Sequence, residues 1–250
     1  MYDPLAGLLV DAATVDDLAR YPSAAVRDPM IGAVAVRDTD LPGLPGLPDG
    51  GPALSVLLTG GAGQLAGPAG LCARRGLPLA AVTVALRDPG DLPGNARRVV
   101  AAVDDARGSG ALADEVTVRV ALPAEPASAG WLAAADEIAA AELEAALAVS
   151  HAAPAAVAEW IDALLDRETG FAASADGSGP AGPTGWVLGL LAATTAAWNG
   201  STNDQVAALL AEPPTRPADL AELSPGRRWC RAVVVPDAVA TAADLRGDPT

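Results

Sequence analysis

The polar side chains that could do chemistry are few, and two aspartates are the first candidates. Asp38 follows an apolar run that ends at Val36, and Asp176 lies in a Gly- and Pro-rich segment after another short run. A carboxylate in such a position could serve as a general base, although Asp-Gly is also an ordinary turn dipeptide. We regard Asp38 and Asp176 as weak catalytic candidates. Glu142 and Glu144 form a second carboxylate pair.

A glycine-rich turn is the second candidate site. Its residues Thr59, Gly60, Gly61 and Gly63 separate an apolar run from a helix of small residues that extends to Arg75. Backbone N–H groups at such a turn can bind an anion, and we name these four as candidate ligand-binding residues. The turn lacks the full G-x-G-x-x-G fingerprint, so tight packing is favoured over anion binding.

Several chemistries are excluded by composition. The chain has 16 basic residues, all of them arginine, which excludes a Schiff-base lysine and a P-loop lysine. His151 is the sole histidine, so a two-histidine metal site is excluded, and we expect His151 to be structural or incidental. Neither a nucleotide motif nor a zinc motif is present. The cofactor is therefore unknown, and no metal ligand is assigned.

The net charge and the two cysteines indicate which partners and which cellular compartment to expect. The net charge of −15 argues against nucleic acid and against an anionic membrane as partners. The longest uncharged apolar stretch, residues 185–198, is too short to span a bilayer, and the start of the chain does not resemble a signal peptide. Cys72 and Cys230 have no C-x-x-C spacing and are expected to be buried, reduced thiols. We therefore expect a cytoplasmic protein.

Strands and helices are predicted to alternate along a single α/β domain of residues 1–250. Residues 1–29 are a lead-in that contains a helix near 15–20, and residues 212–228 are a Pro-rich acidic connection. Surface loops are expected at 40–51 and 176–185. The strands are expected at 30–36, 53–58, 79–86, 115–122, 139–147, 170–175 and 229–235, with an eighth if residues 5–10 are extended.

Helices are expected between these strands, although one segment is ambiguous. They are predicted near 93–107, 128–136, 154–167, 186–198 and 204–210, with a short one at the end. Residues 139–147 have a strongly helical composition, yet their place in the alternation requires a strand. The pattern predicts a TIM-barrel-like (β/α) barrel, which could be complete, incomplete or distorted, with an open doubly wound parallel sheet as the alternative. Either fold places a site at the carboxyl ends of the strands.

From Asp38 onward the chain resembles an uncharacterised family of barrel-like proteins from high-GC bacteria. The segment from Val56 to Gly63, VLLTGGAG, is similar to the family's second strand end, and Asp38 matches an aspartate that closes the preceding strand. Other strand ends depart from the pattern. Thr83 and Ala121 replace glutamates, and residues 142–147, ELEAAL, replace a Lys-x-Arg-Thr-Gly-Gly segment.

Later motifs depart as well. Residues 171–179, FAASADGSG, replace a Phe-Lys-Ala-Thr-Ala-Gly-Leu-His-His segment, and residues 184–188 lack the family's His and Asn. The lost groups would suit an anionic ligand, which Glu142 and Glu144 would repel.

The resemblance therefore implies a divergent, non-catalytic homologue that acts through protein association or an altered ligand. Its partner would be a second copy or a related protein in a hetero-complex. The alternative is an enzyme that acts on a small molecule with carboxylate acid/base groups, with or without a divalent metal.

Overall fold

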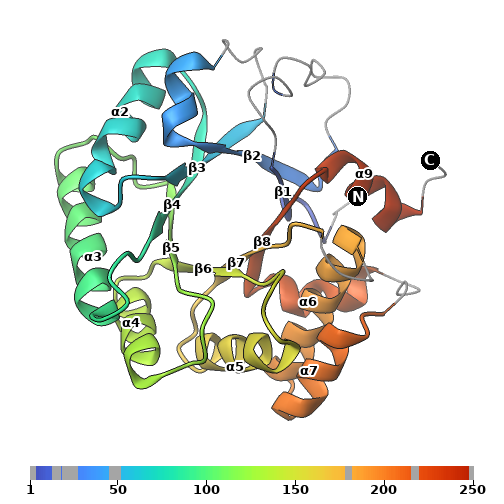
Figure 1. The fold of residues 1–250 in the computed structure, drawn as a ribbon. Coiled ribbons are helices and arrows are strands. Elements are labelled where there is room, and N and C mark those ends of the chain that lie inside the picture. The colour runs from blue at the N-terminus through green and yellow to red at the C-terminus, as the bar shows by residue number, and fades with distance from the viewer. Residues whose placement is uncertain are drawn as a thin grey trace.

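Eight parallel strands close into a barrel. The computed structural model describes residues 4–12, 18, 28–44, 52–177, 182–214 and 220–247. Each strand pairs with the next along the chain, and β8 pairs with β1 (Figure 1). The strands are β1 (Leu9–Asp11), β2 (Ile31–Arg37), β3 (Ala53–Leu58), β4 (Leu79–Ala85), β5 (Thr117–Ala121), β6 (Glu144–Ala148), β7 (Phe171–Ser174) and β8 (Cys230–Val235). The TIM-barrel-like fold is confirmed, and the open-sheet alternative is wrong.

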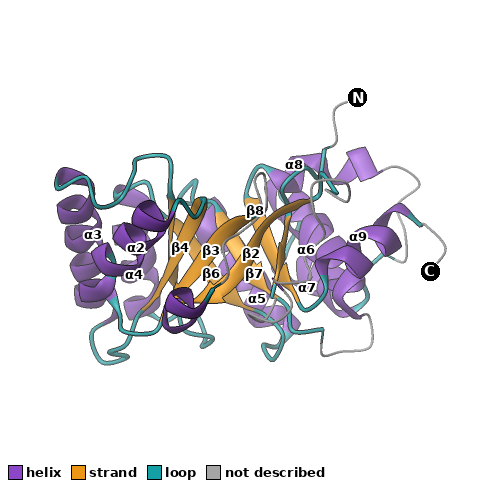
Figure 2. Cartoon of the chain, turned by 90° about the horizontal axis from the view of Figure 1, so that it is seen from above, coloured by secondary structure: helices purple, strands orange, loops and turns teal. Residues whose placement is uncertain are grey.

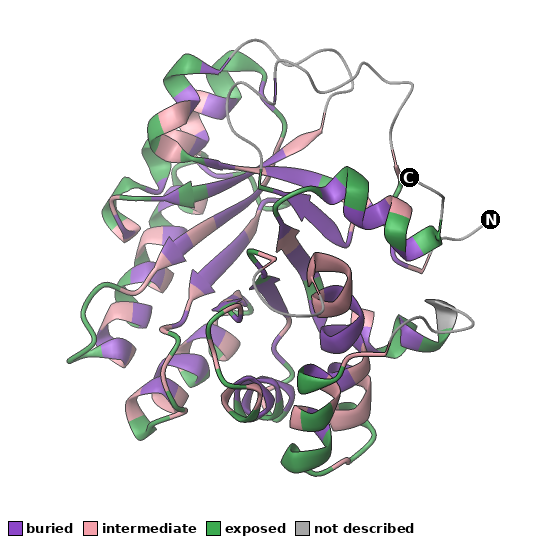
Figure 3. Ribbon diagram, turned by 45° about the vertical axis from the view of Figure 1, so that its right-hand side comes forward, coloured by how far each residue is buried: buried purple, intermediate pink, exposed green. Residues whose placement is uncertain are grey.

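Helices surround the barrel and cover the outer face of its strands (Figure 2). They are α2 (Ala66–Arg75), α3 (Leu92–Gly108), α4 (Ala129–Ala140), α5 (Pro154–Leu165), α6 (Gly182–Trp198), α7 (Asn203–Ala211), α8 (Ser224–Arg227) and α9 (Ala238–Arg246). The buried sides of these helices face the strands, and their exposed sides face solvent (Figure 3). The main hydrophobic core is this layer between strands and helices.

The strands carry large side chains on the outer face and small ones inside. In β5, Val118 and Val120 belong to the main core, whereas Arg119 and Ala121 line a cavity within the barrel. A second, separate cluster consists of Val10, Ala33, Ala172 and Ala232, with Ala35, Ala80 and Val234 packed against it. These residues come from strands around the ring, so they meet in the interior. Barrels of this type are usually filled by bulky branched side chains, and this one is not.

The short strand β1 completes the ring. Leu9 is paired with Ile31 of β2 and with Val233 of β8. Asp11 is buried, and its Oδ1 accepts a hydrogen bond from Ala238 N at 3.1 Å, which fixes the start of α9. The expected eighth strand is therefore real, although it begins at Leu9 rather than at Leu5.

The ambiguous segment 139–147 is divided between a helix and a strand. Helix α4 continues to Ala140, Glu142 has a positive φ of 55°, and β6 begins at Glu144. Local helix propensity thus extends α4 by one turn beyond the expected end at Asp136. Pairing of Arg119 with Glu144 and of Ala145 with Phe171 then imposes the strand.

Three segments expected to be irregular contain helical turns. A 3-10 helix η2 (Asp38–Gly43) includes Pro42, so the prediction of a wholly irregular loop at 40–51 is wrong for its first part. Helix α6 begins at Gly182, inside the loop expected at 176–185. The connection expected at 212–228 holds η4 (Leu220–Leu223) and α8. The helix expected near 15–20 lies outside the described residues except for Leu18.

The two cysteines lie in the core. Cys72 and Cys230 are both buried and free. Burial raises the pKa of the Cys72 thiol, and it raises the pKa of Cys230 to about 12. Both groups are therefore neutral thiols at pH 7. Along the described stretches of the chain, no helix has both the length and the apolar character that crossing a membrane requires.

Arg75 ties η2 to the end of α2. Its Nη1 donates to Leu41 O and its Nη2 to Leu44 O, both at 2.6 Å. Arg75 is exposed, yet both of its terminal nitrogens are used in these contacts. The contact holds the segment after β2 against the helix after β3.

Replacing Arg75 with alanine should lower the free energy of unfolding by about 1–2 kcal/mol, because two charge-assisted hydrogen bonds are lost. Arg74→Ala, at the neighbouring exposed position, is the matched control and should change it by less than about 0.5 kcal/mol. Urea unfolding of both variants measures the difference. Equal effects would show that the Arg75 contacts contribute nothing specific.

Candidate functional site

A cavity of about 380 Å³ opens at the carboxyl ends of the later strands. We call it the mouth cavity. Its lining includes the last residues of β6, β7 and β8, which are Ala148, Ser174 and Val235. The remaining lining residues are Ala12, Ala124, Ser150, His151, Ala175, Asp176, Val234 and Pro236. The surface is therefore mostly apolar, with its polar groups on the segments after β6 and β7.

His151 and Asp176 meet at this cavity. His151 Nε2 lies 3.1 Å from Asp176 Oδ2, and the two side chains are 82% and 51% exposed. Each residue comes shortly after the end of a strand, and β6 and β7 are neighbours in the barrel. Pairing of the strands thus brings together two side chains that lie 25 positions apart in the sequence.

Ser150 holds the segments after β6 and β7 together. Its Oγ accepts a hydrogen bond from Asp176 N at 2.7 Å and donates to Ser174 O at 3.4 Å. Val149 N also donates to Ser174 O, at 3.2 Å. These contacts fix the backbone beneath the His151–Asp176 pair. The hydroxyl of Ser150 is used for this positioning.

Two stacked tryptophans position the segment after β5. The rings of Trp131 and Trp160 are 6.5 Å apart and nearly parallel. Trp131 Nε1 donates to Pro123 O at 3.2 Å, and Trp160 Nε1 donates to Glu125 O at 2.9 Å. Because both rings are buried, they hold the backbone around Ala124 in place at the edge of the mouth cavity.

A second cavity, of about 210 Å³, lies inside the barrel. We call it the interior cavity. It shares Ala148, Ser174 and Val234 with the mouth cavity, so the two adjoin. Its lining is mainly small side chains: Ala35, Ser55, Thr83, Ala121, Ala146, Ala172 and Ala173, together with Leu57, Leu122 and Leu147. The small interior residues leave this volume unfilled.

Arg119 is the charged side chain of the interior cavity. Its Nε lies 3.0 Å from Glu144 Oε2, and the Arg119 side chain is only 10% exposed. Glu144 stands at the first position of β6, towards the amino end of the barrel. The pair therefore closes the interior cavity on the side away from the mouth.

Asp38, the first expected catalytic candidate, has a structural contact. Its Oδ1 accepts hydrogen bonds from Thr59 N at 3.1 Å and from Thr59 Oγ1 at 2.7 Å. Thr39 N donates to the same oxygen at 2.9 Å. Asp38 thus joins the ends of β2 and β3. It does not line the mouth cavity, so it is not brought together with Asp176.

One position of the glycine-rich turn favours glycine. Gly61 has φ of 82°, whereas a Cβ at Gly60 would meet the flexible end of the Gln64 side chain, and a Cβ at Gly63 would meet open space. The residues expected to bind an anion, Thr59, Gly60, Gly61 and Gly63, line neither cavity described above. Their geometry serves the β3–α2 turn.

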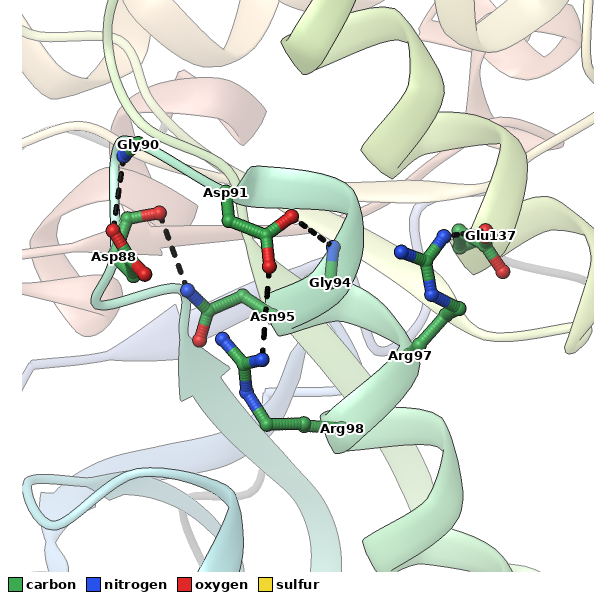
Figure 4. Close-up of polar contacts among 8 residues, drawn as sticks. All are labelled: Asp88, Gly90, Asp91, Gly94, Asn95, Arg97, Arg98 and Glu137. Atoms are coloured by element: carbon green, nitrogen blue, oxygen red, sulfur yellow. Dashed lines mark hydrogen bonds and ion pairs between the residues drawn. The ribbon is translucent and has the colours of Figure 1, made fainter.

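The polar groups after β4 are also used locally (Figure 4). Asp88 Oδ1 accepts from Gly90 N at 3.0 Å, and Asp91 Oδ1 caps α3 by accepting from Gly94 N at 2.9 Å. Asn95 Nδ2 donates to Asp88 O at 3.2 Å, as Figure 4 shows. The carboxylates at this strand end shape the loop and begin the helix.

The expectation that Glu142 and Glu144 occupy a strand's carboxyl end is wrong. Strand β6 begins at Glu144 and ends at Ala148, so both glutamates are at the amino end of the barrel. They cannot repel a ligand at the mouth. The error arose because the ambiguous segment was expected to become a strand several residues too early.

Sequence reasoning missed the His151–Asp176 pair and the buried Arg119. The signal for the pair was present, since both residues follow neighbouring strands at similar distances. The signal for Arg119 was the alternation of β5, which puts an arginine on the same side of the strand as Ala121. Over the described ranges, no cluster of three or more His, Cys, Asp or Glu side chains is placed to hold a metal ion.

Comparison of the sequence with known proteins gives no match: neither a family model nor a curated protein is similar to this chain. The resemblance to barrel-like proteins of high-GC bacteria therefore stays an expectation from the strand-end motifs. The site has to be interpreted from its own geometry.

Asp38→Ala should lower the free energy of unfolding by about 1–2 kcal/mol, because three hydrogen bonds to one carboxylate oxygen are lost. Asp40→Ala is the matched control, because Asp40 Oδ1 accepts a long contact of 3.4 Å from Thr39 Oγ1. Thermal unfolding compares the two variants. If Asp38→Ala unfolds at the same temperature as Asp40→Ala, a structural role for Asp38 is contradicted.

Proposed function

We propose that this protein is a non-catalytic barrel that binds a small, largely apolar molecule at its mouth. The observation that supports this most is the unfilled interior: the mouth cavity and the interior cavity adjoin, and alanine is the most frequent residue in their mostly apolar lining. Small-molecule sites are commonly concave, mostly apolar and supplied with a few polar groups. Here the His151–Asp176 pair is the polar group.

The size of the site limits the ligand. The mouth cavity of about 380 Å³ falls in the usual range for ligand pockets of roughly 300–1,000 Å³. A one- or two-ring molecule would fill it and extend an apolar edge towards Ala146 and Ala172. A hydroxyl or carbonyl at the other end would reach His151 or Asp176 at the rim.

The exposure of the polar pair supports binding rather than catalysis. With His151 82% exposed, water surrounds the imidazole, and an exposed pair in water contributes little electrostatic stabilisation. Catalytic electrostatics depend on preorganised groups in a site that excludes water. The Ser150 hydroxyl is committed to Asp176 N and Ser174 O.

The proposed cellular location is supported by the composition of the chain. A cytoplasmic protein agrees with two buried free thiols and with the charge of −15. A divergent member of the high-GC bacterial family would have kept the barrel while losing the polar strand ends. Association with a second copy or with a related protein remains part of the proposal, and the exposed Trp198 and Val239 are the large apolar side chains that support it.

A second candidate function rests on the same pair. His151 and Asp176 could act together as a general acid–base couple on a small substrate, since their nitrogen and oxygen atoms are within hydrogen-bond distance. Acid–base catalysis by the pair requires that both His151 and Asp176 are essential for turnover. The binding proposal requires only that the cavity is open.

The test uses the neutral fluorescent probe N-phenyl-1-naphthylamine with the purified full chain. We expect saturable binding of one probe per chain. Ala148→Phe, which fills the boundary of the two cavities, should weaken binding at least about tenfold, equivalent to about 1.4 kcal/mol. Ala208→Phe adds the same bulk at an exposed position on α7 and is the control.

The role of the polar pair is tested by competition with 1-naphthol and with naphthalene. His151→Ala should weaken 1-naphthol severalfold and leave naphthalene unchanged. Probe binding that Ala148→Phe does not affect would contradict the proposed site. Turnover of an ester or lactone that both His151→Ala and Asp176→Ala abolish would favour the enzyme.

A further inference from the structure

A third cavity, of different character, lies at the opposite, amino end of the barrel. It has a volume of about 560 Å³, and we call it the arginine pocket. Thr117 and Glu144 are the first residues of β5 and β6, and Arg231 is the second residue of β8. The other lining residues are Pro4, Ala6, Gly7, Arg119, Ser224, Arg227 and Arg228.

The charge of the arginine pocket is opposite to that of the chain. Its described lining contains four arginines and one glutamate, which is 4 − 1 = +3, whereas the whole chain carries −15. The single carboxylate is already shared. Glu144 Oε2 is 3.0 Å from Arg119 Nε, and its Oε1 is 4.0 Å from Arg231 Nε. Positive charge is therefore concentrated here without an equal number of carboxylates.

Arg227 is a partly buried arginine of this pocket. Its Nη1 donates to Cys230 O at 3.2 Å and its Nη2 to Ala6 O at 3.3 Å. Its Nε is buried with no hydrogen-bond partner. Burial lowers the pKa of the Arg227 guanidinium, and the neighbouring charge of Arg231 also lowers it. A negative charge in the pocket would stabilise the charged guanidinium and so offset both effects.

Arg228 is held in place by aromatic rings. Its guanidinium carbon lies 4.8 Å from the centre of the Trp229 ring and 5.4 Å from that of Trp198. Cation–π contacts of this kind restrict the guanidinium without neutralising its charge. Helix α8, which carries Arg227 and precedes Arg228, is packed closely on α6, because a Cβ at Gly226 would overlap Leu191 O. Arg227 and Arg228 are thus held in place before any ligand arrives.

We propose that the arginine pocket binds a small organic anion that carries two or more negative charges on phosphate or carboxylate oxygens. Arginine guanidinium groups donate paired hydrogen bonds that match such oxyanions, and several of them around one cavity favour a multiply charged ligand. The hydroxyls of Thr117 and Ser224 are further donors at the same cavity. The ligand would approach from the amino end of the barrel, so it is separate from the molecule proposed for the mouth.

The experiment is calorimetric titration of the full chain with pyrophosphate and, separately, with citrate, at constant ionic strength and without divalent metal. Binding of either is expected, and the comparison decides between phosphate and carboxylate ligands. At tenfold excess over Kd the bound anion should raise the Tm by about 3–6 °C. Chloride at the same ionic strength should give no such rise.

Three variants locate the site. Arg231→Ala, at a half-exposed position, should weaken anion binding at least about tenfold, whereas Arg98→Ala, at a comparably exposed position on α3, should leave it unchanged. Glu144→Gln removes the competing carboxylate and should strengthen binding about threefold or more. Circular dichroism confirms that each variant is folded, and Arg231→Gln replaces Arg231→Ala if the latter is not.

The proposal is overturned if neither anion binds above the chloride baseline. It is also overturned if Arg231→Ala and Arg98→Ala behave alike, or if Glu144→Gln weakens binding in a folded protein. Loss of probe binding at the mouth has no bearing on these results, because the two cavities lie at opposite ends of the barrel.

Discussion

The size of the side chains inside the barrel determines what both of its ends can do. Eight parallel strands close through the β1–β8 pairing, and Val and Leu on their outer faces supply the core against the helices. The inner faces therefore do not have to supply that burial, and most of their positions carry alanine, serine or threonine, with Val10, Leu57, Arg119 and Val234 as the larger side chains. An interior of bulky branched residues would be solid. This one keeps a cavity of about 210 Å³ beneath the mouth.

Charge inside the barrel separates the two ends. Arg119 and Glu144 meet at 3.0 Å below the interior cavity, and both also line the arginine pocket on the other side. A buried pair of this kind costs desolvation energy, so its value lies more in fixing positions than in stability. Above it the surface is apolar with His151 and Asp176 at the rim. Below it the surface is basic. One chain thus offers two sites of opposite chemical preference.

The alternation of short apolar runs with helical segments was enough to predict the barrel, because such an alternation indicates parallel strands joined by helices. The prediction failed where local helix propensity conflicted with the alternation of strands and helices. Residues 139–147 have helical propensity, and only pairing with β5 and β7 makes Glu144 the start of a strand. The site was harder to predict. Asp38 looked catalytic but binds Thr59, whereas Asp176 meets His151 through a contact between neighbouring strands that no local pattern encodes.

The central claim is that small residues leave the barrel open to a ligand from its mouth. The most direct measurement is methyl NMR of the ¹³C-alanine-labelled protein during titration with 1-naphthol. The account predicts that the methyl signals of Ala146, Ala148 and Ala172, which line the interior cavity, shift together and saturate, while that of Ala208 on α7 stays fixed. Shifts confined to surface alanines, with the interior methyl signals unchanged, would contradict it.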